Sequence, residues 1–217
     1  MLQDALDGGL AWRIKEIDDL RKAARTAEKT RQRSFIRAGI AILYAHWEGY
    51  VKSAAENYVN YIACQSIPYR DLRPCFIALG LRAELVTMAS AGRFATSTAA
   101  VEFLLRSLDK PAKLPMKGAV DMDSNLSSTV FANIAGWIGV DTSRYETKFH
   151  FVDESLVKRR NQVAHGEYLE LDEPAFQNLV DETIQLIRWF KTDIENALAV
   201  DAHIAVVPLA SSSAGRT

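Results

Sequence analysis

Apolar residues recur at three- and four-residue steps along most of the chain, which is the spacing of one face of an α-helix. The first such region covers residues 10–62 without a proline, and we interpret it as two helices, either separate or continuous. Few apolar residues lie between Lys22 and Arg37, where basic and polar side chains dominate. The later half carries one long stripe, which we assign to the core: Ile36, Ile40, Leu43, Trp47, Tyr50, Val51, Ala54, Tyr58 and Ile62.

Prolines, glycines and capping residues divide the middle of the chain. A helix over about 72–88 is predicted, with Asp71 as its N-cap and Pro74 in its first turn. Residues 90–97 are expected to form a loop, followed by a short helix over 99–108 that Thr98 would cap. Residues 110–123 have the composition of an exposed connection, and a further helix is predicted over 126–138, ended by Gly139.

The last third has the clearest periodicity. We predict a helix over 153–166 and a long helix that Asp172 caps, with Pro174 in its first turn and an apolar stripe up to Leu198. No segment alternates between apolar and polar residues as a half-buried strand would. The sequence therefore predicts an all-α fold of about five to seven helices, in one domain over residues 1–200 with a flexible tail over 201–217. The polar part of that tail, from Val206 onward, is expected to be disordered.

Composition restricts the possible functions. The 217 residues include 26 basic and 27 acidic side chains, so a nucleic-acid site would have to be a local basic patch. No stretch approaches the ~20 apolar residues of a membrane span, and the first residues lack the pattern of a signal peptide. We therefore expect a cytoplasmic protein that does not contact a membrane. Cys64 and Cys75 are too few for a structural zinc site and are interpreted as ordinary thiols.

The segment LVKRRNQVAHG, residues 156–166, carries the candidate chemistry. At about 100° per residue, Arg160 would lie in the middle of the apolar arc of its helix, whereas Asn161 and His165 would lie together outside that arc. An arginine on an apolar stripe is costly unless a partner neutralises it. Two interpretations remain open on these grounds: Arg160 forms a buried ion pair with an acid such as Glu48, or it has a functional role.

The arrangement Arg160-Asn161-x-x-x-His165 resembles the signature motif of the HEPN superfamily. The segments LYAHWEGYVK (residues 43–52), SNL (124–126) and VDESLVKRRNQVAHGE (152–167) also resemble a prokaryotic, toxin-like ribonuclease branch of that superfamily. The resemblance covers about residues 31–198. It implies an HEPN-like helical bundle without a cofactor or catalytic metal, and a homodimer in which two motifs face one cleft.

The activity implied by the resemblance is endonucleolytic cleavage of RNA by attack of a ribose 2′-OH on the adjacent phosphate. His165 can move a proton near neutral pH, Arg160 can neutralise charge on phosphoryl oxygens, and Asn161 can hydrogen-bond the imidazole or the phosphate. Lys158 and Arg159 are candidates for binding the flanking phosphates of the RNA substrate. One ideal helix would point Arg160 and His165 about 140° apart, which the long arginine side chain, a loosened last turn near Gly166 or a two-fold partner could resolve.

The implied biological role is that of the toxic effector of a toxin–antitoxin or phage-defence system, with a neutralising antitoxin or defence partner protein. Two alternatives stay open. The chain could be a catalytically silent HEPN-like domain that binds RNA, a nucleotide or a protein partner, or a purely structural bundle with a buried arginine. Glu48 is interpreted as a packing or supporting residue that need not contact the motif.

Overall fold

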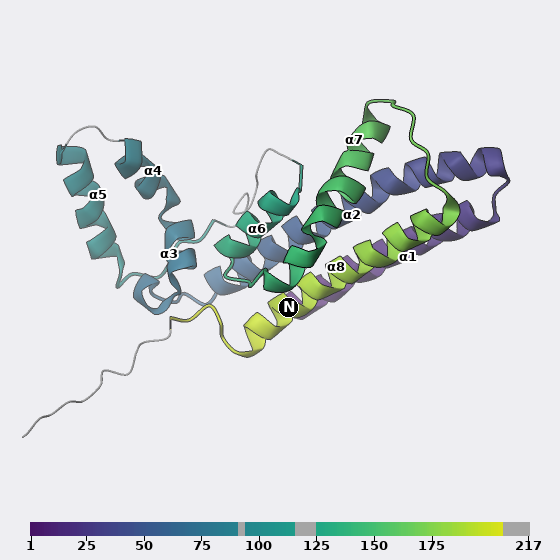
Figure 1. The fold of residues 1–217 in the computed structure, drawn as a ribbon. Coiled ribbons are helices and arrows are strands. Elements are labelled where there is room, and N and C mark those ends of the chain that lie inside the picture. Colours follow the sequence, from purple (N-terminus) through teal and green to yellow (C-terminus); the bar gives the residue numbers. More distant parts are fainter. Residues whose placement is uncertain (91–93, 116–124, 206–217) are drawn as a thin grey trace, which may run out of the picture.

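A computed structural model describes residues 1–90, 94–115 and 125–205 (Figure 1). For residues 87–90, 94–97 and 100 it describes the backbone alone. Within these ranges the chain is helical, and its β-structure is limited to two isolated bridges, Pro68 with Pro111 and Leu72 with Ile204. The predicted all-α class is confirmed.

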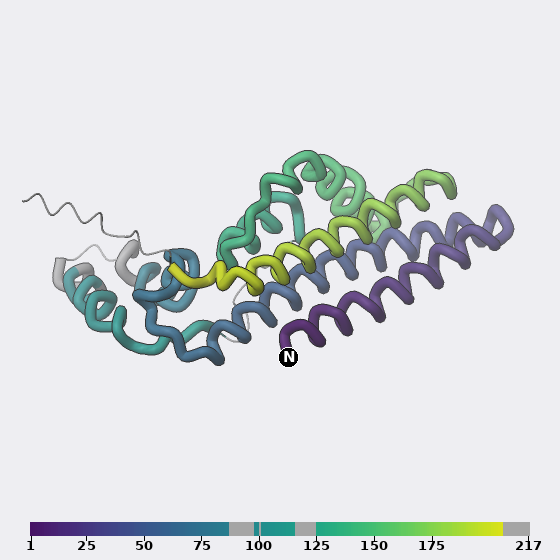
Figure 2. Tube along the Cα trace, turned by 90° about the horizontal axis from the view of Figure 1, so that it is seen from below, coloured from purple at the N-terminus to yellow at the C-terminus, as the bar shows by residue number. Residues whose placement is uncertain are grey.

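Three long helices lie side by side and form an elongated bundle (Figure 2). They are α1 (Leu2–Thr26), α2 (Lys29–Ala63) and α8 (Glu173–Ala199). The region predicted as two helices is indeed two, because the chain turns at residues 27 and 28 and runs back along α1. As expected, Asp172 caps α8, and its Oδ1 atom accepts a hydrogen bond of 2.9 Å from the Ala175 N–H.

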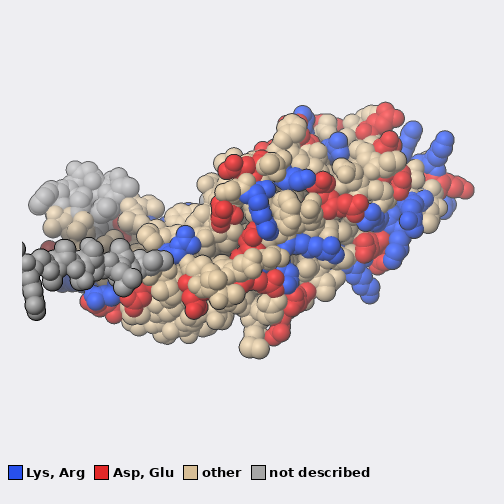
Figure 3. Space-filling model, turned by 60° about the horizontal axis from the view of Figure 1, so that its bottom comes forward, with Lys and Arg blue, Asp and Glu red and all other residues tan. Residues whose placement is uncertain are grey.

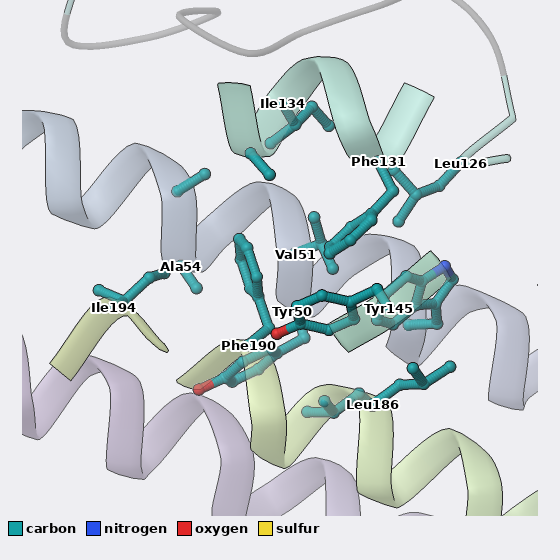
Figure 4. Close-up of a cluster of buried hydrophobic side chains, with 14 of the residues drawn as sticks. Tyr50, Val51, Ala54, Leu126, Phe131, Ile134, Tyr145, Leu186, Phe190 and Ile194 are labelled. Carbon is teal, nitrogen blue, oxygen red and sulfur yellow. The ribbon is translucent and has the colours of Figure 1, made fainter. Parts of the chain in front are cut away.

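The core lies where α2 and α8 meet α6 (Ser128–Trp137) and the 3-10 segment η2 (Ser143–Lys148). Phe131 of α6 packs against two aromatic rings, Tyr145 of η2 and Phe190 of α8 (Figure 4). The centroid of the Phe131 ring lies 4.7 Å from that of Tyr145 and 5.5 Å from that of Phe190. Trp47 and Tyr50 are fully buried here. Tyr58 is buried further along α2, so the assignment of the α2 stripe to the core is confirmed.

A smaller group of elements lies at one end of the bundle (Figure 1). It contains η1 (Tyr69–Asp71), α3 (Pro74–Gly80), α4 (Arg82–Ser90) and α5 (Phe94–Ser107). The prediction of a single helix over 72–88 was wrong, since the chain turns at Leu81 between α3 and α4. Asp71 is not the cap either: Leu72 is buried in the bridge with Ile204, so α3 cannot begin before Pro74.

Two further boundaries differ from the predictions. The predicted loop over 90–97 is shorter, because α4 continues to Ser90 and α5 already begins at Phe94, which puts Thr98 inside a helix and not at its cap. Residues 201–205 are packed, with His203 buried and Ile204 in a bridge, so the ordered chain extends past the predicted tail boundary. The expected disorder from Val206 and part of the connection, residues 116–124, lie outside the described residues.

None of the helices in the described ranges has both the length and the apolar character needed to cross a bilayer.

Candidate functional site

The motif lies on two consecutive helical segments, η3 (Phe151–Val157) and α7 (Lys158–Ala164). The first has π-helical hydrogen bonding, in which each bond spans five residues instead of four. Leu156 is buried, Val157 and Val163 are partly buried against the core, Arg160 is half-buried, and Ala164 at the end of α7 is exposed. Arg160 therefore lies among apolar neighbours on the partly buried face of its helix, and it is not itself fully buried.

Asp153 holds the π-helical segment against α6. Its carboxylate accepts two hydrogen bonds from Ser128, one from the backbone N–H at 2.8 Å and one from the hydroxyl at 2.6 Å. Leu126, two residues before Ser128, is fully buried against the core. These contacts fix the chain around Asn125 relative to the start of α7.

The Arg160 guanidinium lies over an aromatic ring of α2. Its central carbon is 4.0 Å from the centroid of the Tyr44 ring, a distance typical of a cation–π contact. Nη2 of Arg160 donates a hydrogen bond to Oδ1 of Asn125, and Nε is buried without a hydrogen-bond partner among the described residues. The Tyr44 hydroxyl accepts a 2.6 Å hydrogen bond from the Leu126 N–H. The arginine is thus held from two sides within one protomer.

Glu48 supports this arrangement indirectly. Its carboxylate pairs with Lys52 at 2.9 Å and hydrogen-bonds to Tyr44, and no ion pair within 4.0 Å joins it to Arg160 in the described structure. Burial raises the pKa of Glu48, but hydrogen bonds from Tyr44 and Lys52 and the charges of Lys52 and Arg160 outweigh burial and lower this pKa overall. The interpretation of Arg160 as half of a direct ion pair with Glu48 is not supported, whereas a supporting role for Glu48 is.

Tyr44 stays protonated at neutral pH. Burial is the largest cause, and with the hydrogen bond to Glu48 it raises the pKa of Tyr44 to about 12. Its hydroxyl is therefore a structural donor and acceptor, and it is poorly suited to take up a proton from a substrate.

Asn161 and His165 lie at the open end of the site. Oδ1 of Asn161 accepts a hydrogen bond of 3.4 Å from Nδ2 of Asn125. The backbone N–H of His165 donates to the carbonyl of Asn161 at 2.9 Å and ends α7, after which Gly166 has φ +72°, a conformation that favours glycine. His165 is exposed, as its position outside the apolar arc predicted.

The basic residues before Arg160 are also accessible. Lys158 is exposed and pairs with Glu154 at 2.5 Å, and Arg159 is half-buried. Asn125 thus bridges Arg160 and Asn161, while Lys158 and His165 face solvent. Tyr44 and Asn125 were not predicted as site residues, although both lie in segments noted for their resemblance to HEPN proteins.

Nowhere in the described ranges do three His, Cys, Asp or Glu side chains gather closely enough to hold a metal ion.

Comparison with known proteins places the chain in a family. No curated protein and no solved structure matched it significantly. The family described as MAE_28990-like HEPN matches residues 2–201, which is nearly the whole sequence and includes the bundle, the π-helical segment and α7. The chain therefore belongs to this HEPN family.

Proposed function

We propose that this protein is a metal-independent endoribonuclease of the HEPN type, with Arg160, Asn161 and His165 as its catalytic residues. The observation that carries the proposal is that α7 holds a guanidinium fixed by two neighbours and ends at an exposed imidazole. Arg160 is oriented by Tyr44 and Asn125, and His165 at the end of α7 is free to reach a substrate.

The proposed reaction needs one mobile proton and one stationary positive charge. His165 takes the proton from a ribose 2′-OH, the 2′ oxygen forms a bond to phosphorus, and the bond from phosphorus to the 5′ oxygen breaks as that oxygen takes a proton from water. His165 then returns its proton to the solvent. The products are a 2′,3′-cyclic phosphate and a 5′-hydroxyl end. Arg160 neutralises charge that grows on the phosphoryl oxygens, and Asn161, oriented by Asn125, binds the imidazole or the phosphate.

Lys158 and Arg159 would bind the phosphates on either side of the cleaved bond. Lys158 is exposed and shares its charge with Glu154 only at the surface, where such a pair contributes little. It can therefore exchange this partner for a phosphate at small cost.

The active species in this proposal is a homodimer whose α7 helices meet. None of the seven residues of α7 is buried in the described protomer, although the helix includes Val163 and Ala164. Closed two-fold pairs are the commonest oligomers, and pairing here would gather two motifs in one cleft.

The proposed biological role is that of a toxic effector in a toxin–antitoxin or phage-defence system, restrained by a partner protein. This role rests on the resemblance to toxin-like HEPN ribonucleases. Induced expression in a bacterial host tests it: wild type should arrest growth, and His165→Ala should not. Equal growth of the two strains would contradict a toxic role.

One observation favours a second candidate, a catalytically silent domain that binds RNA, a nucleotide or a protein partner. Arg160 already has an aromatic and an amide partner in its own protomer, as an architectural arginine would. Such a domain would bind RNA without cutting it.

Incubation of the purified chain with a 5′-labelled single-stranded RNA in excess EDTA separates the two candidates. The ribonuclease is expected to produce fragments with cyclic phosphate ends, and His165→Ala should produce none. Activity that is lost in EDTA and restored by Mg²⁺ would refute the mechanism. Intact RNA under all conditions would favour the silent domain.

A further inference from the structure

The turn between α1 and α2 carries a concentrated positive charge. Residues 21–37 include seven basic side chains and a single acidic one, Glu28, in a chain whose net charge is -1. Figure 3 shows many of the blue side chains gathered toward one end of the molecule. We define the basic tip by six of these residues: Lys22, Arg25, Lys29, Arg31, Arg33 and Arg37.

The cations of the basic tip have no carboxylate partner among the described residues, in contrast to two basic residues that lie nearer the middle of the bundle. Arg21, next to the tip, pairs with Asp181 at 2.8 Å, and Lys148 pairs with Glu182 at 2.6 Å. No ion pair within 4.0 Å involves any of the six residues of the basic tip in the described part of the chain. Five of them are exposed and Arg37 is half-buried, so the charge is available to a polyanion.

The basic tip is connected to the proposed catalytic motif. Nη1 of Arg37 donates a hydrogen bond of 2.7 Å to the carbonyl of Glu167, two residues after His165. Lys29, Arg33 and Arg37 are four residues apart and share one face of α2, along about 12 Å of helix. A basic row therefore leads along α2 to the segment that carries the imidazole.

A hollow of about 200 Å³ lies between this row and the segment after α7. Its opposite wall carries Glu170, Asp172 and Glu173, so the hollow itself has as many carboxylates as cations and is not an anion site. Repulsion from that wall would keep phosphates on the α2 side. Tyr168, also in the lining, is 75% exposed and offers a free aromatic face of the kind on which bases stack.

We propose that the basic tip is a docking surface for single-stranded RNA. The backbone phosphates follow the row of Lys29, Arg33 and Arg37, a base stacks on Tyr168, and the strand continues to His165. The cleavage at the end of this path rests on the proposed function, whereas docking at the tip does not require cleavage.

Binding is tested in the His165→Ala chain, which keeps the RNA intact. Fluorescence anisotropy with a labelled 12-nucleotide single strand gives Kd between 50 and 300 mM salt. Lys29→Gln with Arg33→Gln should lower the slope of log K against log salt by about 1.4, since each phosphate contact on a single strand contributes about 0.7. If the variant and the wild type bind equally at the 1 M reference, the lower slope makes the binding of the variant at 0.1 M salt roughly 25-fold weaker than that of the wild type.

The matched control is Lys110→Gln with Lys113→Gln, which removes the same charge from two exposed residues outside the basic tip. This pair should leave both slope and Kd unchanged. A second pair tests stacking: Tyr168→Ala should weaken binding, and Tyr168→Phe should bind as wild type because it keeps the ring. Equal effects of the tip and control pairs would overturn the proposal and indicate a response to net charge alone.

Cleavage by the wild-type chain separates this inference from the proposed function. Cleavage with no effect of the tip variants would refute docking at the tip and leave the ribonuclease standing. Tip-dependent binding without any cleavage would support the docking surface and refute the ribonuclease. Binding of the tip to vesicles with 30% phosphatidylserine, without RNA binding, would assign the tip to an anionic membrane and overturn the proposal.

Discussion

Tyr44 connects more of the site than any residue of the motif itself. Its ring supports the Arg160 guanidinium, and its hydroxyl satisfies the Leu126 N–H and hydrogen-bonds to Glu48. A single α2 side chain therefore relates α7 to the segment that enters α6. Sequence periodicity correctly assigned this stretch of α2 to a buried helix, but periodicity alone cannot show which buried ring lies under an arginine 116 positions later.

Tyr44→Phe should separate the two roles of this side chain. The ring and its contact with Arg160 remain, but the buried Leu126 N–H loses its acceptor, which costs about 1–3 kcal/mol. Urea denaturation measures the loss, and Tyr61→Phe, at an exposed ring on the same helix, is the control that should change little. Unchanged stability of Tyr44→Phe would mean that the Leu126 N–H finds another partner.

Arg160→Ala is expected to abolish RNA cleavage, whereas Arg159→Ala should only weaken it. Arg160 is the one of the two that is oriented by Tyr44 and Asn125, and removing a fixed charge-stabilising donor typically costs about 10²–10³ in kcat. Rates with a short RNA under single-turnover conditions measure this. An inactive Arg159→Ala with an active Arg160→Ala would shift the assignment by one residue.

Two buried histidines should make stability depend on pH. Burial is the main cause that lowers the pKa of both His46 and His203; nearby Glu16 and Asp201 oppose it, and Arg13 lowers the pKa of His46 further. The folded chain thus binds these protons less tightly than the unfolded chain, where the pKa is about 6.5. The two neutral histidines therefore contribute to the free energy of unfolding above pH 6.5, and this contribution is lost as the pH falls through their lowered pKa values in the folded chain.

Urea midpoints at pH 7.5 and 5.5 test this linkage. The midpoint of the wild type should fall at the lower pH, and the fall should be smaller in His46→Gln with His203→Gln. His165→Ala is the control, because it removes one exposed histidine and keeps both buried ones, and it should show the same fall as the wild type. An equal fall in the double variant would assign the pH dependence to other groups.

At the scale of elements, helix types and caps were predictable where local signals are strong. Asp172 and Pro174 begin α8 as predicted, because a cap and a first-turn proline act within one turn. The π-helical segment η3 was not predictable, since its wider turn is fixed by contacts with α6, such as Asp153 with Ser128, that are distant in sequence. The start of α3 at Pro74 likewise depends on Leu72 meeting Ile204, which is distant in sequence.

Gly39 determines how closely α2 and α8 approach. A Cβ atom at this position would overlap the ring of Phe176, whereas one at Gly8, in the middle of α1, would meet nothing within 4 Å. Gly39→Ala should therefore destabilise the protein by about 1–3 kcal/mol. Gly8→Ala should stabilise it by roughly 1 kcal/mol through helix propensity alone. Thermal unfolding of both variants distinguishes them, and a Gly39→Ala protein as stable as Gly8→Ala would show that Phe176 moves aside freely.

At the scale of the whole molecule, the proposed dimer predicts that a charge on α7 separates the two chains. Ala164→Glu puts a charge on the exposed end of α7, and it should give monomers in sedimentation velocity and lose cleavage. Ala5→Glu makes the same change on the exposed surface of α1 and should remain dimeric and active. A monomeric Ala164→Glu protein with full activity would show that one protomer suffices.

The bundle has a consequence for synthesis of the chain. Its three long helices are α1, α2 and α8, and α8 is the last of them to leave the ribosome. At about 5–20 residues per second, roughly 7–27 s pass between the translation of residue 63, at the end of α2, and that of residue 199, at the end of α8. During this time the face of α2 around Gly39 lacks Phe176 of α8, which later covers it. Because the motif ends at His165, a nascent chain cannot present the complete motif until α7 and this residue have been translated.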